Sequence, residues 1–262
     1  MSSVALATHE WVDDNRVGGA PVVLLIHGVT GWWKTWWRVG PALADRGWRV
    51  VAVDLRGHGH SPRFDGPATI ADLAQDVAAV IEASAPRADL LVGHSLGGAV
   101  SVELAIRRPD LVERLVLEDP PANSRAGDGA WLEKLDREMR AAATSPDAEF
   151  ARQRAENPDW LDEDVRQDVE GRALADREGI LAFMARPNGS RVPDLVRQLP
   201  MPTLHLLAAG DGRSVYAGDA RRRLVEELPP HARLVEFDCG HVLHRDRYER
   251  YVGTILEWTD RA

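Results

Sequence analysis

The segment Gly93-His94-Ser95-Leu96-Gly97-Gly98 has the residue types and spacing best suited to covalent chemistry. It follows the short run Asp89-Leu90-Leu91-Val92, which predicts a buried strand, and Leu96–Arg107 has the spacing and composition of a helix. Ser95 is therefore expected on a sharp turn between a strand and a helix. The flanking glycines suit this turn, because it strains the backbone and leaves no room for side chains near a nucleophile. We expect Ser95 to be that nucleophile.

A serine nucleophile needs a base, a group that orients the base, and donors for the developing oxyanion. The best candidate for the base is His241, which follows Gly240 directly after the last expected strand. Site residues of parallel α/β sheets gather at that edge. The oxyanion donors are expected to be two backbone amides. One belongs to Leu96, at a helix N-terminus, and the other to Val29, in the glycine-containing loop 27–31.

Expected strands and helices alternate along most of the chain, which predicts a mostly parallel, doubly wound α/β sheet covered on both faces. The expected strands are Pro21–Ile26, Arg49–Val53, Asp89–Val92, Leu115–Leu117, Thr203–Ala208 and Arg233–Phe237. The expected helices between and after them are Trp36–Arg46, Ile70–Ala83, Leu96–Arg107, Ala220–Leu228 and Tyr248–Trp258.

One region, residues 122–198, breaks this alternation because it contains no convincing strand. It carries charged helical segments rich in alanine and arginine, punctuated by prolines. These segments are Trp131–Ala143, Ala148–Ala155 and Asp164–Asp176. We expect a helical lid at 122–198, inserted into a core formed by residues 1–121 and 199–262.

Four segments together resemble the α/β-hydrolase fold family, and their order and spacing extend over nearly the full chain. They are His27-Gly28, Asp54–Ser61, Gly93–Gly98 and Gly240-His241. The resemblance implies an inserted lid where 122–198 lies. It also implies that Asp54–Ser61 is a structural loop that braces the site and takes no part in catalysis.

The sequence departs from the family at the acid that orients the histidine. Similar proteins usually carry it three residues after the glycine that ends the strand before the last one, and that position is Arg213 here. An arginine cannot accept the imidazole N–H. Asp211 lies on the same loop, whereas Asp119 ends the strand after the helix that follows Ser95, where some family members carry their acid. We favour Asp119, with Asp211 as the alternative and Glu118 as a third candidate.

Four tryptophans form a second unusual cluster, at positions 32, 33, 36 and 37. Packing in the core and under the lid is one interpretation, since Trp36 and Trp37 begin an expected helix. Trp32 and Trp33 follow the oxyanion loop, so we expect them to line a substrate pocket, where aromatic walls suit an apolar substrate. In the lid, Trp131, Phe183 and Met184 are candidates to close this pocket.

The composition excludes several classes of function. A net charge of −9 argues against nucleic acid or an anionic membrane as partner, and no apolar run is long enough to cross a bilayer. The single cysteine, Cys239, rules out an internal disulfide and a cysteine-based zinc site. The first residues lack the pattern of a secretory signal, so a cytoplasmic protein is expected. No motif for a metal, nucleotide or flavin is present, so we expect no cofactor and a small-molecule substrate.

These observations predict a serine hydrolase acting on a small, apolar carboxylic ester or lactone through an acyl-enzyme. Hydrolysis of a carbon–carbon bond, or perhydrolysis, would use the same serine and histidine and stays open as an alternative. A ligand sensor that retains a slow hydrolase site is a third possibility. The substrate and the oligomeric state are not fixed by the sequence.

Overall fold

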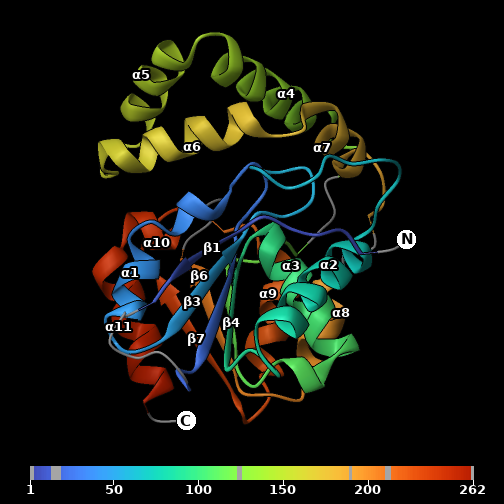
Figure 1. Cartoon of the computed structure of the whole chain (residues 1–262), viewed down its shortest axis with the longest axis vertical. Coiled ribbons are helices and arrows are strands. Elements are labelled where there is room, and N and C mark those ends of the chain that lie inside the picture. Colours follow the sequence, from blue (N-terminus) through green and yellow to red (C-terminus); the bar gives the residue numbers. More distant parts are fainter. Residues whose placement is uncertain (1–2, 13–18, 123–125, 189–190, 210–213, 261–262) are drawn as a thin grey trace.

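The computed structural model describes residues 3–12, 19–122, 126–188, 191–209 and 214–260 (Figure 1). A seven-stranded sheet has the strand order β1-β3-β2-β4-β5-β6-β7, in which β1 pairs antiparallel and all the other neighbours pair parallel. The strands are β1 (Thr8–Trp11), β2 (Val22–Ile26), β3 (Arg49–Val53), β4 (Leu90–His94), β5 (Leu115–Glu118), β6 (Thr203–Ala208) and β7 (Ala232–Phe237).

The central strands are short apolar runs because helices cover both faces of the sheet. Every residue of β2, β4, β5 and β6 is buried. Their register matters for function. Ile26 pairs with Gly93, and His94 pairs with Glu118, so β2, β4 and β5 end side by side. The loops that follow these strands therefore meet at one edge of the sheet.

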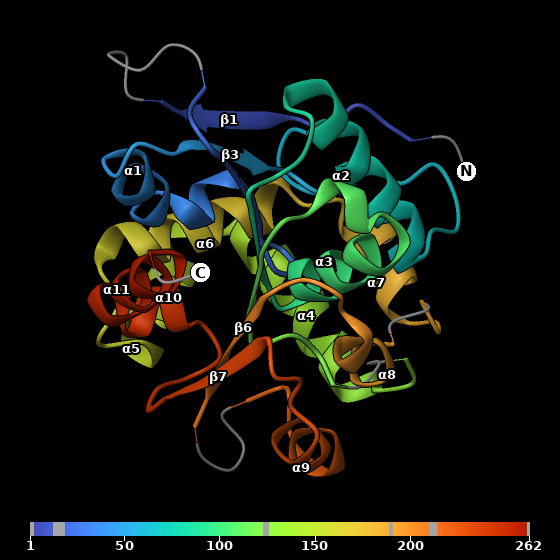
Figure 2. The ribbon, with the colours of Figure 1, turned by 90° about the horizontal axis from the view of Figure 1, so that it is seen from below.

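Helices form two layers around the sheet, and each layer packs its own hydrophobic cluster (Figure 2). On one face lie α2 (Ile70–Ser84) and α3 (Leu96–Arg107), and on the other α1 (Val39–Ala44) and α11 (Tyr248–Thr259). Helix α2 begins with a capping box in which the Thr69 side chain accepts from the Asp72 amide and Asp72 accepts from the Thr69 amide. The remaining short helices are η1 (Trp33–Trp36), η2 (Pro109–Leu111), α9 (Gly218–Glu226) and α10 (Leu243–Asp246).

Between β5 and β6 the described residues form helices joined by short turns and loops, and no strand. The helices are α4 (Gly129–Thr144), α5 (Pro146–Glu156), α6 (Asp162–Leu174), α7 (Arg177–Met184), α8 (Val192–Leu195) and η3 (Val196–Gln198). Helices α4 to α7 lie above one end of the sheet (Figure 1). Side chains of α4 and α6 line the same cavity as Ser95, which identifies that end as the carboxyl edge of the strands.

The structure differs from the sequence prediction in several elements, including the short helices η2 and α10, which were not predicted. Strand β1 was not predicted: it is a four-residue edge strand of half-exposed and exposed residues, so it lacks a hydrophobic run. The single helix predicted for Trp36–Arg46 is instead the 3₁₀ turn η1 followed by α1. Pro41 explains the break, because proline lacks an N–H and is tolerated only in the first turn of α1. Among the helices of the described residues, none has the length and apolarity needed to cross a membrane.

Candidate active site

Ser95 lies between β4 and α3 with a backbone φ of 51°, a backbone conformation that residues other than glycine rarely adopt. The neighbouring glycines are required by close backbone packing. A Cβ at Gly93 would overlap the Ser101 side chain and the Gly97 carbonyl, and one at Gly97 would overlap the Ile26 carbonyl. Glycine is therefore required at both positions, because β4, α3 and β2 approach too closely for a side chain.

Three predicted residues come together at this turn in a hydrogen-bonded chain. The Oγ of Ser95 lies 3.0 Å from Nε2 of His241, and Nδ1 of His241 lies 2.6 Å from Oδ2 of Asp119. Asp119 is fully buried, whereas the His241 side chain keeps an exposed fraction of 29%. The arrangement matches a nucleophile, a base and an orienting acid.

Several donors besides His241 fix the carboxylate of Asp119. Its Oδ1 accepts from the hydroxyl of Ser214, and its Oδ2 accepts from the Val215 amide at 3.0 Å. The backbone of Asp119 itself has a φ of 40° and donates its N–H to the Leu206 carbonyl at 2.8 Å. The alternative acid, Asp211, and the family's usual position, Arg213, both lie outside the described residues.

The third candidate acid, Glu118, binds a different histidine. Its Oε1 accepts from the backbone N–H of His244 at 3.0 Å, and Nδ1 of His244 lies 2.8 Å from the same oxygen. Burial lowers the pKa of His244 well below its usual range and raises the pKa of Glu118. Beside this pair, Nε2 of His94 lies 3.2 Å from the carbonyl of His241 and so supports the backbone that carries the base.

Sequence reasoning missed Ser214, the Glu118–His244 pair and the role of His94. An acidic residue beside Asp119 and a histidine three residues after His241 were visible in the sequence. The sequence favoured Asp119 as the partner of His241 but did not indicate that Glu118, its neighbour at the end of β5, contacts His244.

The loop after β2 carries Val29, the second predicted oxyanion donor. His27 braces this loop: its Nδ1 lies 2.7 Å from the Gly28 carbonyl, and its Nε2 accepts from the Leu55 amide at 3.0 Å. Thr30 follows with a φ of 62°. Val29 lines both cavities at Ser95, and Leu96 is the first residue of α3. Within the described part of the chain, neither amide donates a hydrogen bond, so the role predicted for them stays available.

The loop predicted to brace the site does so through Asp54. Its Oδ1 accepts from the Trp33 amide at 2.6 Å and its Oδ2 from the His60 amide at 2.8 Å. These bonds tie the chain after β3 to the chain after β2, next to the oxyanion loop.

Two cavities of different character meet at Ser95, His241, Val29 and Trp131. The first, which we call the apolar cavity, is about 420 Å³ and is lined mainly by residues of α2, α3, α4 and α7 and of the chain after β6. They include the apolar residues Ile70, Leu96, Ala99, Met184 and Val215 and the polar residues Asp128, Asn188 and Ser214. The polar cavity, of about 260 Å³, contains charged residues of α4, α6 and α10, including Lys134, Glu138, Asp168, Arg172 and Arg245. One part of a substrate at Ser95 would therefore contact the apolar cavity, and another part would contact the polar cavity.

The structure corrects the prediction for Trp32 and Trp33, which line neither cavity. Trp32 is 1% exposed and donates its indole N–H to the Gln167 carbonyl of α6 at 3.1 Å. Trp33 stacks on His9 of β1, with ring centroids 3.7 Å apart. Both rings turn away from Ser95 because η1 directs them under α6 and towards the edge strand. Of the other predicted wall residues, Trp131 and Met184 line the apolar cavity, whereas Phe183 stacks on Phe64.

Cys239 lies close to His241 in sequence but is buried with a protonated thiol. Burial, with the nearby Asp246 carboxylate, raises the pKa of Cys239 to about 12, so it is not a reactive thiolate at neutral pH. Among the described residues, no group of three or more His, Cys, Asp or Glu side chains is arranged to hold a metal ion.

Comparison with known proteins places this chain in a family. The sequence model of the alpha/beta hydrolase fold matches residues 21–248. Lipase LipV of Mycobacterium tuberculosis is 31% identical over 242 residues, covering 86% of this chain and 88% of that protein. An sn-1-specific diacylglycerol lipase of Xenopus laevis, ABHD11, is 28% identical, covering 95% of this chain and 82% of that protein. The solved structure of a thermophilic esterase from Thermogutta terrifontis, with malate bound, is 25% identical, has a TM-score of 0.74, and covers 98% and 93% of the two chains.

Proposed function

Since the chain belongs to the α/β-hydrolase fold family, we propose that it is a serine hydrolase that cleaves small apolar carboxylic esters or lactones through an acyl-enzyme on Ser95. The observation that carries this proposal is the continuous hydrogen-bonded chain from Ser95 through His241 to the buried carboxylate of Asp119. The named relatives that span most of the chain are a lipase and a diacylglycerol lipase, which supports hydrolysis of ester bonds.

In the proposed reaction, the Oγ of Ser95 attacks the ester carbonyl while Nε2 of His241 accepts the hydroxyl proton. Asp119 holds the proton on Nδ1 of His241 and stabilises the imidazolium that forms. The tetrahedral oxyanion accepts hydrogen bonds from the amides of Val29 and Leu96, and Leu96 adds the positive end of the α3 dipole. The imidazolium then protonates the leaving alcohol, and a water activated by His241 hydrolyses the acyl-enzyme.

Residues 122–198 would act as the lid of this site. Trp131 of α4 lines both cavities, and Met184 of α7 lines the apolar one, so these helices complete the walls around the ester. The apolar cavity is suited to a small hydrocarbon group, because burial of such a group removes apolar surface from water. A cytoplasmic location remains part of the proposal and is supported by the sequence alone.

The test is hydrolysis of a panel of p-nitrophenyl esters and aryl lactones by the full chain, with Ser95→Ala as the control. We expect multiple turnovers with the wild type and a loss of about 10⁴-fold or more in kcat with Ser95→Ala, because the nucleophile is removed. The panel also ranks acyl sizes against the apolar cavity.

Wild-type turnover that persists unchanged in Ser95→Ala would refute the proposed mechanism. If no ester or lactone is turned over, the result would instead favour carbon–carbon cleavage or ligand sensing as the function. Product analysis separates these, since an ester yields an acid and an alcohol, whereas carbon–carbon cleavage of a diketone yields an acid and a ketone.

A further inference from the structure

The chain on both sides of His241 contacts the helices α4, α5 and α6, which we call the lid helices. Val242, the residue after the proposed base, packs against a hydrophobic cluster. Among the described residues, the rest of this cluster belongs to the lid helices and to the turn between α5 and α6. Its members are Ala142, Phe150, Trp160, Val165 and Val169. The packing of the residue next to the base therefore depends on the lid helices.

On the other side of His241, a carboxylate joins the backbone to the lid helices. Oδ2 of Asp246, in α10, accepts from the Gly240 amide at 2.7 Å, and Oδ1 of Asp246 accepts from the indole N–H of Trp160 at 2.6 Å. Trp160 is buried in the turn between α5 and α6, so its indole N–H needs an acceptor. The one carboxylate therefore ties the position of this turn to the residue before the base.

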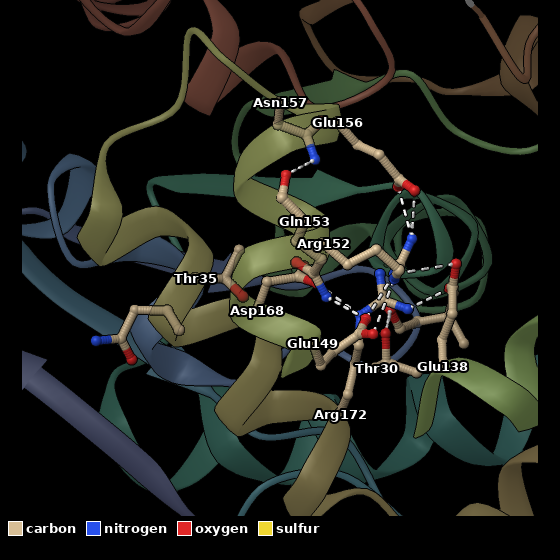
Figure 3. A network of polar contacts seen from close by, with 12 residues as sticks. Thr30, Thr35, Glu138, Glu149, Arg152, Gln153, Glu156, Asn157, Asp168 and Arg172 are labelled. Atoms are coloured by element: carbon tan, nitrogen blue, oxygen red, sulfur yellow. Dashed lines mark hydrogen bonds and ion pairs between the residues drawn. The ribbon is translucent and has the colours of Figure 1, made fainter. Parts of the chain in front are cut away.

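Ion pairs connect the lid helices to one another and to α10. Glu138 of α4 pairs with Arg152 of α5 and with Arg172 of α6, as Figure 3 shows. Asp168 of α6 accepts from Nε of Arg172 at 2.6 Å and from Nη1 of Arg245, in α10, at 2.9 Å. Because these pairs link the lid helices and α10, we expect a displacement of the lid helices to reach α10, which carries Asp246.

The core holds the same histidine from two other directions. Nδ1 of His241 lies 2.6 Å from Asp119, and the His241 carbonyl lies 3.2 Å from Nε2 of His94. Neither contact holds the preceding peptide N–H, which is the one bonded to Asp246. Because catalysis is sensitive to displacements of about 1 Å, this third contact affects how well the base reaches Ser95.

We propose that Asp246 is a positioning residue that couples the lid helices, through Trp160, to the backbone of the general base. Docking of the lid helices on the core then holds His241 within hydrogen-bonding distance of Ser95. Asp246 is not among the described residues that line either cavity, so it acts through His241 and not by contact with the substrate. This inference rests on the proposed function, since it concerns the base of the same reaction.

The first test is Asp246→Asn, measured with p-nitrophenyl butyrate. The amide has only one acceptor oxygen, so its NH₂ group must face either the Gly240 amide or the Trp160 indole. We expect kcat and kcat/KM to fall together by about 10-fold or more, because the base is displaced while the cavities keep their lining. A lower Tm with unchanged kcat would show that the carboxylate is merely structural and would overturn the proposal.

A double-mutant cycle tests the route through Trp160. Trp160→Phe keeps a ring in the hydrophobic cluster and removes the indole N–H. Trp160 also lines the polar cavity, so a loss in this variant alone does not distinguish positioning from contact with the substrate. We expect Trp160→Phe to lower kcat about 5-fold in the wild type and less than about 2-fold in the Asp246→Asn background. An equal loss in both backgrounds overturns this route.

Trp37→Phe is the matched control. The indole N–H of Trp37 donates to Asp164 of α6 at 2.9 Å, so this bond also joins a lid helix to the core by way of a carboxylate. Its removal should lower Tm and keep kcat within about 2-fold of the wild type, because the bond does not pass through Asp246. A loss of kcat equal to that of Trp160→Phe would mean that any loosening of the lid helices lowers activity, which overturns the assignment of Asp246.

A spectroscopic readout separates this proposal from the proposed function. If the wild type hydrolyses no ester, the proposed function fails by itself, and the coupling is judged by proton NMR. The Nδ1 proton shared by His241 and Asp119 should give a downfield resonance, assigned by its loss in His241→Gln. Asp246→Asn should shift or broaden this resonance, whereas Trp37→Phe should leave it unchanged. An unchanged resonance in Asp246→Asn overturns the coupling.

Discussion

Thr30, Ser95 and Asp119 share a backbone property: of the described residues other than glycine, they are the ones with positive φ. One lies in the proposed oxyanion loop, one is the proposed nucleophile and one is the proposed acid. Such conformations cost about 1–3 kcal/mol each, so they persist only where the surrounding structure holds them. The hydrogen bond from the Ser95 amide to the Glu118 carbonyl, at 2.9 Å, joins two of these turns directly.

At the residue scale, Asp119→Asn tests the choice of acid. The amide cannot keep the proton on Nδ1 of His241 while also accepting the bonds of Ser214 and Val215, so the imidazole loses its tautomer and orientation. We expect kcat for p-nitrophenyl esters to fall on the order of 10⁴-fold. Steady-state kinetics of the purified variant measure this loss.

Two further Asp→Asn variants control this experiment. Asp89→Asn changes a carboxylate that accepts from the Val22 amide, outside the active site, and should keep near wild-type kcat. Asp211→Asn should also remain close to wild type. A large loss in Asp211→Asn together with an active Asp119→Asn would reverse the assignment of the acid.

At the element scale, β6 contains a buried histidine whose ring nitrogens form no hydrogen bond with the described residues. His205 is 1% exposed, pairs in register with Leu117 and Leu234, and has no partner for either ring nitrogen among the described residues. Burial lowers the pKa of His205 to about 4. The strand tolerates the imidazole only in its neutral form, which links the stability of β6 to pH.

The sign of this linkage follows from the two pKa values. In the unfolded chain the His205 imidazole takes up a proton below about pH 6.5, whereas in the folded chain it does so only below about pH 4. The unfolded state therefore gains relative stability as pH falls between these values. His205 therefore lowers the free energy of unfolding by about 3 kcal/mol at about pH 4 and below, and this destabilisation is absent above about pH 7.

We expect His205→Leu to stabilise the fold by about 1–3 kcal/mol at neutral pH, since it removes two unsatisfied buried nitrogens. Its advantage over the wild type should widen as pH falls from about 6.5 to about 4. Urea unfolding at several pH values measures both effects. A constant difference across this range would show that His205 does not carry the acid sensitivity.

At the scale of the whole molecule, α6 joins the helices above the sheet to the core. Asp164 is 1% exposed and accepts from the indole N–H of Trp37 and from Arg38, each at 2.9 Å. Nearby, the indole N–H of Trp160 donates to Asp246 of α10. Because the polar cavity lies between these helices and the core, the same contacts set its shape.

We expect Asp164→Ala to lower the free energy of unfolding by about 2 kcal/mol, because it removes the acceptor of the Trp37 indole and the ion-pair partner of Arg38. The matched control is Glu170→Ala on the same helix, which breaks only an exposed pair with Lys34 and should cost less than about 1 kcal/mol. Chemical denaturation of both variants gives the comparison. Equal losses would mean that Asp164 does not anchor α6.

The sequence by itself determined the features that depend on local patterns. Apolar runs and glycine positions gave the parallel strands and the turn at Ser95, because buried strands and sharp turns each restrict residue type over a few positions. The choice of His241 came from its place after the last strand. The preference for Asp119 came from its place at a strand end together with the resemblance to a family in which some members carry the acid there. The structure brings both within hydrogen-bonding distance of the chain that begins at Ser95.

Only the tertiary structure decided which distant side chains meet. In the folded chain, Trp32 and Trp33 line neither cavity, Glu118 contacts His244, and the Ser214 hydroxyl donates to Asp119. It also gathered charges from α4, α6 and α10 into one polar cavity. These outcomes depend on helix orientation and on pairing between residues far apart in the chain. Local periodicity carries no information about either.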